Sequence, residues 1–205
     1  MTRAWLVLGC LIATLLATAL HADERWQVLR GAEARLHWRA PGLQAHPEKA
    51  EAMASSIGYR VERYFWKAQE TGGAFALAGL RDFTDSEHYI GGRVDLQKSA
   101  ATLLKGLETP PLKPLDQADR VLFTGLGLAT ARRFSLGVRE CLSLGLYAPS
   151  AEPAEPPNGK AKAEPMTEGN LRLDALYCAK AGKPLAVEDL PDLAKSLGVK
   201  QTGEN

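Results

Sequence analysis

Acidic and histidine side chains gather at one place in the sequence, between Asp82 and His88. In a helical turn, Asp85 and His88 stand three residues apart on one face, where both can contact a single metal ion. A metal site needs a third and usually a fourth ligand, and the sequence indicates none for this pair. The same segment is typical of a helix start with Asp85 as its N-cap. We therefore predict no metal site. Asp85 and His88 are the residues to test as ligands if a metal is found.

A second candidate for chemistry is the glycine-rich segment 125–130, which has the composition of a phosphate-binding loop. The dinucleotide-binding fingerprint requires a third glycine where Thr130 stands, and an acidic residue about 20 positions further on. Arg132 and Arg133 carry the charge that a phosphate needs. The glycines are equally typical of a bent or bulged strand pair. We predict the strand pair and no phosphate site, with Gly125, Gly127, Arg132 and Arg133 as the candidates for one.

Signatures of common catalytic sites are absent from the sequence. The chain has no G-x-S-x-G nucleophile elbow, no H-E-x-x-H zinc motif, no C-x-x-C-H haem motif and no phosphate-loop lysine motif. A catalytic triad assembled from distant segments is left open, because one sequence does not exclude it. We expect no catalysis and no cofactor.

The N-terminal segment 1–22 has the pattern of a secretory signal peptide. Arg3 supplies a positive charge, the following residues are uncharged as far as Leu20, and small residues follow. Cleavage after Ala22 or after Ala19 fits the pattern, and we favour a mature start near Ala22–Asp23. An uncleaved membrane anchor is the alternative, because the apolar run is about as long as the shortest transmembrane helices. We predict a periplasmic or secreted protein.

Removal of the signal peptide takes Cys10 away and leaves two cysteines, Cys141 and Cys178. Each lies in a run typical of a β-strand, and a Pro/Ala/Glu/Lys-rich segment separates the runs. If the runs form an antiparallel pair with the cysteines opposite each other, Tyr147 falls opposite Arg172. We predict a disulfide at the base of a disordered loop at about 149–169. Two free buried thiols are the alternative.

The composition excludes several classes of protein. Hydrophobic residues make up 45% and charged residues 24% of the 205 residues, as in soluble globular chains. The formal net charge of +1 gives no overall attraction for nucleic acid. Arginines alternate with tryptophans between residues 25 and 39, a pattern that can bind nucleic acid, but nearby glutamates dilute the charge. We predict an edge strand there and no nucleic-acid partner.

Further elements follow from hydrophobic periodicity. Residues 47–56 read as a helix, and residues 59–67 and 74–83 as a β-hairpin. A single helix over 47–70 is left open, because its apolar residues also fit helical spacing. Asp95 is the expected cap of a helix that runs to Gly106.

The remainder of the chain predicts strands and a final helix. A strand begins at Val121, and the two cysteine-bearing runs follow it. Residues 187–197 read as a helix with Gly198 as its C-cap, followed by a flexible tail at 200–205. The sequence therefore predicts one α+β domain over residues 23–199, with a mainly antiparallel sheet flanked by helices.

This order of elements resembles the PsbP-like group of exported α/β/α domains. The likeness lies in the hairpin Tyr59–Phe83, the helix near Asp95–Gly106, and the late strand pair followed by a C-terminal helix. It extends over most of the mature chain as a pattern of elements, without a diagnostic motif. The resemblance implies an accessory or assembly role.

We therefore expect an exported, non-catalytic accessory protein that binds an envelope protein or a small ligand. An envelope hydrolase or metal-dependent enzyme centred on Asp85 and His88 is one alternative. A membrane-tethered assembly factor is the other, and in it the N-terminal segment contacts the membrane.

Overall fold

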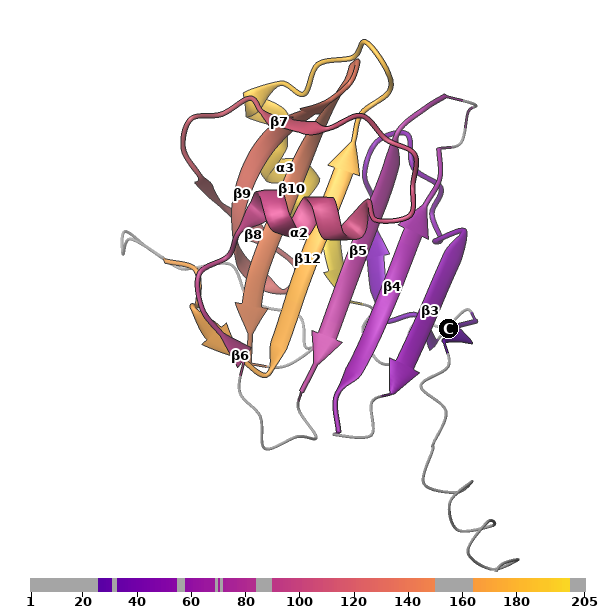
Figure 1. Cartoon of the computed structure of the whole chain (residues 1–205), viewed down its shortest axis with the longest axis vertical. Helices are drawn as coiled ribbons and strands as arrows, with labels where there is room; N and C mark the ends of the chain where they lie inside the picture. The colour runs from indigo at the N-terminus through magenta and orange to yellow at the C-terminus, as the bar shows by residue number, and fades with distance from the viewer. Residues whose placement is uncertain are drawn as a thin grey trace, which may run out of the picture.

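A computed structural model of the chain describes residues 26–30, 33–54, 58–68, 70, 72–83, 90–149 and 164–199 (Figure 1). Of these residues, 48% lie in strands and 12% in helices. The fold is predominantly β, so the predicted α+β class with flanking helices is wrong. The predicted signal peptide at 1–22 and tail at 200–205 lie outside the described residues.

A nine-stranded antiparallel sheet forms the centre of the molecule. Its order is β1-β3-β4-β5-β12-β10-β9-β7, and β8 also pairs with β9. The strands are β1 (Gln27–Val28), β3 (Lys49–Ala54), β4 (Arg60–Trp66), β5 (Phe75–Asp82), β7 (Leu112–Pro114), β8 (Arg120–Thr124), β9 (Gly127–Leu136), β10 (Arg139–Ala148) and β12 (Leu171–Cys178). The pairing of β5 with β12 joins the two halves of the chain, which are far apart in sequence.

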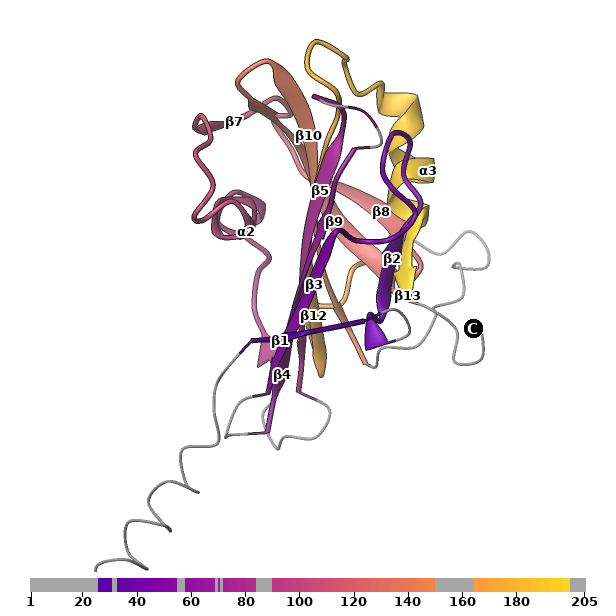
Figure 2. The ribbon, with the colours of Figure 1, turned by 90° about the vertical axis from the view of Figure 1, so that its right-hand side faces the viewer.

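Two small sheets and two short helices complete the described structure. The small sheets pair β2 (Leu36–Trp38) with β13 (Leu197–Val199), and β6 (Ile90–Gly91) with β11 (Glu168–Gly169). The helices are α2 (Leu96–Leu103) and α3 (Leu190–Lys195), the latter preceded by the 3-10 turn η2 (Val187–Asp189). Figure 2 shows α2 on one side of the large sheet and α3, β2 and β13 on the other. We call the side that carries α2 the front face and the opposite side the back face.

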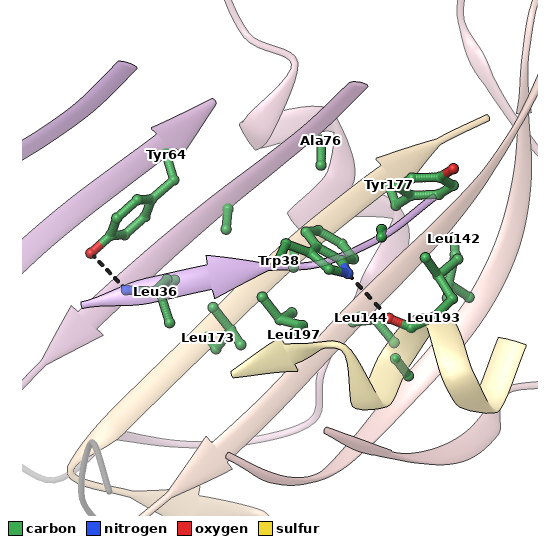
Figure 3. Packing of buried hydrophobic residues seen from close by; sticks show 14 of the residues in the cluster. Leu36, Trp38, Tyr64, Ala76, Leu142, Leu144, Leu173, Tyr177, Leu193 and Leu197 are labelled. Atoms are coloured by element: carbon green, nitrogen blue, oxygen red, sulfur yellow. Dashed lines mark hydrogen bonds between the residues drawn. The ribbon is translucent and has the colours of Figure 1, made fainter. Parts of the chain in front are cut away.

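The back face carries the main hydrophobic core (Figure 3). Trp38 of β2 is fully buried, and its ring meets that of Trp66 edge to face at 6.1 Å. The indole Nε1–H of Trp38 donates to the carbonyl oxygen of Leu193 at 3.1 Å. This bond satisfies a buried donor and fixes α3 to β2, because an unpaired buried N–H is costly. The strand predicted in this segment is β2, which pairs with β13 alone in the described structure and is therefore an edge strand, with Leu36 and Trp38 buried on one face.

The front face has a smaller core beneath α2, and the disulfide lies in it. Cys141 of β10 and Cys178 of β12 are fully buried and form a disulfide bond. They stand directly opposite each other in an antiparallel register that also sets Tyr147 opposite Arg172. The disulfide and its register confirm the sequence prediction. Residues 150–163 of the predicted loop at 149–169 lie outside the described residues, and the last two residues of that range form strand β11.

Segment 47–56 is the clearest error in the predicted elements. It contains strand β3, in which Ala50 and Ala52 are buried and the residues between them are not. Buried residues therefore recur at every second position, as in a strand. Hydrogen bonding to β4 and β1 makes this segment a strand despite its helix-like sequence. The alternative of a single helix over 47–70 is also wrong, because β4 begins at Arg60. The hairpin of β4 with β5 is confirmed, as is α2 with the Asp95 carboxylate accepting from the N–H of Lys98 at 3.0 Å.

The C-terminal helix is shorter than predicted. It ends at Lys195, and Gly198 lies in β13 instead of capping the helix. A close approach of backbones explains the glycine at this position. A Cβ on Gly125, in the turn between β8 and β9, would stand 2.8 Å from the Cα of Gly198. The absence of side chains at Gly125 and Gly198 thus allows the backbone of β13 to lie against the turn between β8 and β9. The N–H of Gly125 donates to the carbonyl oxygen of Leu197 at 2.7 Å.

Candidate functional site

A groove of about 760 Å³ lies on the front face beside α2. Its floor comes from β3, β4, β5 and β12, and α2 with the preceding segment 90–95 forms its wall. Figure 1 shows α2 crossing the sheet and leaving long parts of these strands with no helix over them. The volume falls within the range of about 300–1,000 Å³ that is typical of sites for small molecules.

Two glycines lie in one row of the sheet, and one of them, Gly79, lines the groove. Arg63 of β4 stands opposite Gly79 of β5, Gly79 opposite Asp174 of β12, and Asp174 opposite Gly145 of β10. A Cβ on Gly145 would stand 2.5 Å from Val94 and 3.3 Å from the Nη2 of Arg172, so glycine is needed there. A Cβ on Gly79 would make only an ordinary contact, at 3.5 Å from Leu103. The hollow above Gly79 therefore reflects a missing side chain and not a crowded backbone.

The next row of the floor sets two arginines side by side. Arg81 of β5 pairs directly with Arg172 of β12 in the antiparallel register. Like charges that stand directly opposite each other repel and destabilise a strand pair. One of the two must therefore be neutralised or turned away.

Arg172 is the member of this pair that is neutralised. Its side chain is buried, and its Nε–H donates to Asp174 at 3.1 Å. Its Nη2 lies 3.3 Å from the Ser99 hydroxyl on α2, and its guanidinium lies 4.7 Å from the centre of the Tyr147 ring. Burial alone lowers the pKa of Arg172, but the hydrogen bond and charge of Asp174 outweigh burial and raise it. Arg172 thus holds α2 to the sheet.

Positive charge is in excess around the groove. Among the described residues, its lining contains three carboxylates and seven cationic residues, namely Lys49, Arg63, Arg81, Arg93, Lys98, Lys105 and Arg172. Each of these carboxylates already has a partner. Glu51 forms an ion pair with Lys49 at 2.9 Å, and Asp174 forms one with Arg172. Asp95 accepts a hydrogen bond from the backbone at the start of α2.

Four cations of the groove are left without a carboxylate. Within the described part of the chain, Arg81, Arg93, Lys98 and Lys105 form no ion pair and are exposed. Arg63 instead lies over the ring of Trp26, at 3.9 Å from its centre. These charges can be satisfied by an anion that enters the groove.

The groove also has an apolar side, next to α2. Phe65 of β4 and Leu77 of β5 are direct neighbours in the sheet, and Leu103 of α2 lies beside them. Phe65 and Leu103 are only partly buried, so apolar surface faces the groove. The groove therefore combines cations with apolar side chains.

The candidate metal residues Asp85 and His88 lie outside the described residues. No group of three or more His, Cys, Asp or Glu side chains that could hold a metal ion occurs in the residues that are described.

The glycine-rich segment is a tight turn between two antiparallel strands. Gly125 and Leu126 connect β8 to β9, and Gly127 begins β9. This is the predicted strand pair, and no helix follows to present its N-terminus to a phosphate.

The two candidate phosphate-binding arginines are engaged with aspartates. Arg132 pairs with Asp119 at 2.7 Å. Arg133 contacts Asp116 at 2.8 Å and donates to the carbonyl of Leu185 at 3.0 Å. The hydrogen bond from Arg133 lowers the pKa of Asp116, and the positive charge of the guanidinium contributes. The structure therefore does not bring Gly125, Gly127, Arg132 and Arg133 together as an open anion site.

A buried polar cluster on the back face was missed by sequence analysis. Glu62 of β4 is fully buried and accepts hydrogen bonds from Tyr64, Arg35 and Arg60. Burial raises the pKa of the Tyr64 hydroxyl, and the neighbouring Glu62 charge raises it further. The hydroxyl also accepts from the backbone N–H of Arg35 at 3.1 Å. The cluster joins the segment before β2 to the sheet, and only the regular placement of Glu62 and Tyr64 on one strand face hints at it.

A second cavity, of about 560 Å³, lies where Tyr177 and Leu193 meet the segment around Pro41. The described part of its lining has three cations and three carboxylates, so these charges balance. The Tyr177 hydroxyl donates to the carbonyl of Pro41 at 2.8 Å. The charge excess therefore distinguishes the front groove from this cavity.

No protein-family model matches the chain, and comparisons with curated proteins and with solved structures find no match. The resemblance to PsbP-like domains thus stays a prediction. Among the described residues, no helix has both the length and the apolar character needed to span a bilayer.

Proposed function

We propose that this protein is an exported, non-catalytic binding protein whose front groove holds a small anionic ligand. The observation that carries the proposal is the imbalance of charge in the groove. All three carboxylates of its lining are engaged within the protein, whereas Arg81, Arg93, Lys98 and Lys105 have no described acidic partner. An anion that enters the groove gains several charge-assisted contacts at once.

The location of these cations strengthens the proposal. Cations scattered over a convex surface are solvated, and each contributes little to binding. Here they surround a concave site whose low-dielectric walls concentrate their field. The fixed pair of Arg172 with Asp174 anchors α2, so the wall of the site is held in place without a ligand.

Export is supported by two independent features of the chain. Segment 1–22 has the pattern of a signal peptide, and the disulfide between Cys141 and Cys178 is of the kind that persists in oxidising compartments. An oxidising compartment also fits the proposed role, because an exported binding protein meets small anions in the periplasm or the medium.

The proposal is tested by mapping anion binding on the folded, disulfide-bonded protein. Amide chemical shifts are recorded by NMR during titration with inorganic phosphate and with dodecanoate, at constant ionic strength set with sodium chloride. We expect saturable shifts at groove residues such as Gly79 and Ser99, and none at the balanced cavity near Tyr177. A cationic probe of similar size, dodecyltrimethylammonium, should leave the groove unshifted.

The matched variants are Arg81→Gln and Lys113→Gln. Both remove one positive charge from an exposed position, but Lys113 lies on β7 and does not line the groove. Weaker anion binding in the first variant alone supports the proposal. If neither anion produces saturable shifts at the groove, or if the cationic probe produces the same shifts, the proposed function is wrong.

A further inference from the structure

We infer that the anion of the front groove is the carboxylate head group of a single-chain amphiphile, held beside Arg81 above Gly79, with its apolar chain against the side of the groove next to α2. This inference rests on the proposed function and specifies the class of its ligand. It is carried by how polarity changes along strand β5 of the floor.

Strand β5 shows this change most simply. Successive residues on its groove face are Leu77, Gly79 and Arg81, since side chains alternate between the two faces of a strand. The strand thus presents an apolar side chain, a hollow and a cation in that order. Next to it, β4 places Phe65 beside Leu77, Arg63 beside Gly79 and Val61 beside Arg81. On β5 the apolar residue therefore lies toward α2 and the cation away from it, whereas β4 adds an apolar side chain, Val61, beside Arg81.

Leu103 of α2 completes the apolar end. Its Cδ2 lies 3.5 Å from the position that a Cβ on Gly79 would take, so it borders the space beside Gly79. Phe65 and Leu103 are partly buried against the front core and leave apolar surface toward the groove. A hydrocarbon chain covers this surface, whereas a small inorganic anion does not.

The charged end of the groove is suited to a single carboxylate. Arg81 has no described acidic partner, and Arg172 beside it is already neutralised by Asp174. Arg63 stands on the neighbouring strand, opposite Gly79. A planar guanidinium binds a carboxylate through two parallel hydrogen bonds, which favours Arg81 as the residue that holds the head group.

The sheet itself argues for an amphiphile rather than an acidic peptide. Extended peptides bind to sheets by adding a strand to an open edge, where backbone groups are free. The floor strands β4, β5 and β12 each pair with a neighbour on both sides. Their backbone groups are therefore used within the sheet, and the groove offers only side chains to a ligand.

Isothermal titration calorimetry on the disulfide-bonded protein tests the inference with three probes. Dodecanoate carries both the chain and the charge, dodecanol carries the chain alone, and acetate carries the charge alone. Dodecanoate and dodecanol are used below the concentrations at which they aggregate. We expect dodecanoate to bind at least tenfold more tightly than either of the other two.

Variants then locate the two ends of the ligand. Arg81→Gln should weaken dodecanoate binding about tenfold and leave dodecanol unchanged, because one charge-assisted contact is lost. Lys113→Gln, the matched control, should change neither. Gly79→Val should weaken both probes, because its side chain fills the hollow, and it should still fold, since valine favours strands. Urea unfolding of each variant verifies the fold.

The outcomes separate this inference from the proposed function. If acetate binds the groove as tightly as dodecanoate, the chain contributes nothing, and the inference is wrong while the proposed function stands. Equal losses in Arg81→Gln and Lys113→Gln would overturn the position of the head group. If none of the anions binds, both the inference and the proposed function fail.

Discussion

The two faces of the large sheet are built from the same strands and have different roles. On the back face, Trp38, Trp66 and Tyr64 fill the space between the sheet and the layer of β2, β13 and α3. On the front face, one helix of eight residues covers part of the strands and leaves a groove of about 760 Å³ beside it. Strand β4 shows the contrast within a few residues, since Tyr64 and Trp66 enter the back core while Arg63 and Phe65 face the groove.

This contrast indicates how stability and binding are divided. The back face buries large side chains and pairs the polar atoms of Trp38 and Tyr64, which stabilises the fold. The front face keeps exposed cations close together, an arrangement that does not favour the folded state by itself. A side chain on the back face should therefore matter for folding, and an exposed cation of the groove should matter for the ligand.

The largest effect is expected from Trp38→Ala. Trp38 is fully buried and donates to Leu193, so its removal leaves a cavity and loses this hydrogen bond. We expect a loss of about 3–5 kcal/mol in the free energy of unfolding, measured by urea denaturation. Val28→Ala is the control, because Val28 is 65% exposed, and it should change stability by less than about 0.5 kcal/mol. A small loss in Trp38→Ala would show that the back face does not dominate stability.

The disulfide is the stabilising device of the front face. Replacement of both Cys141 and Cys178 by alanine should cost about 2–4 kcal/mol, because the bond closes a loop with a sequence separation of 37 residues. Urea denaturation of this variant is compared with that of the wild type in the presence and absence of a reducing agent. The reducing agent should destabilise only the wild type. Equal stability of the oxidised wild type and the double variant would contradict this account.

The ion pair of Asp116 with Arg133 predicts a dependence on pH. The hydrogen bond from Arg133 holds the pKa of Asp116 below its ordinary value of 3.8. The pair therefore stabilises the folded state above that pH, and this contribution is lost as the pH falls through the lowered pKa. Asp116→Asn should cost about 1–2 kcal/mol near neutral pH and progressively less as the pH falls below the lowered pKa, as measured by urea denaturation at each pH. A difference that does not change with pH would mean that the charge of Asp116 is not the cause.

The smallest effect on folding is expected from Arg81→Gln. Arg81 is exposed and stands opposite Arg172, so removal of its charge relieves repulsion. The free energy of unfolding should stay within about 0.5 kcal/mol of the wild type, and any change at low salt should be a gain. Thermal unfolding at low and high salt measures this directly. A clear loss of stability would place Arg81 with the structural residues and remove it from the binding site.

Local patterns in the sequence predicted several elements correctly. The pairing of Cys141 with Cys178 followed from two β-type runs around a low-complexity segment, and the cap of α2 followed from Asp95. Segment 47–56 was misread because Pro47 and two glutamates imitate a helix start, whereas strand pairing decides the structure. Gly198 was misread as a helix cap because its close contact with Gly125 joins segments distant in sequence.

The groove was not predicted, and the reason is topological. Its floor depends on β5 pairing with β12, which brings Arg81 beside Arg172 from segments about ninety residues apart. Each arginine alone looks like an ordinary solvated charge on a strand. A usable signal would have been the alternation of Leu77, Gly79 and Arg81, read together with the alternation of Arg63 and Phe65.

A crystal structure of the disulfide-bonded protein with dodecanoate most directly tests the claim that the front groove binds the ligand and the back face stabilises the fold. We predict electron density for the carboxylate within hydrogen-bond distance of the Arg81 guanidinium, and for the chain between Leu103 and the pair of Phe65 with Leu77. Density for the ligand in the cavity near Tyr177 instead, or a chain that lies away from α2, would contradict the account.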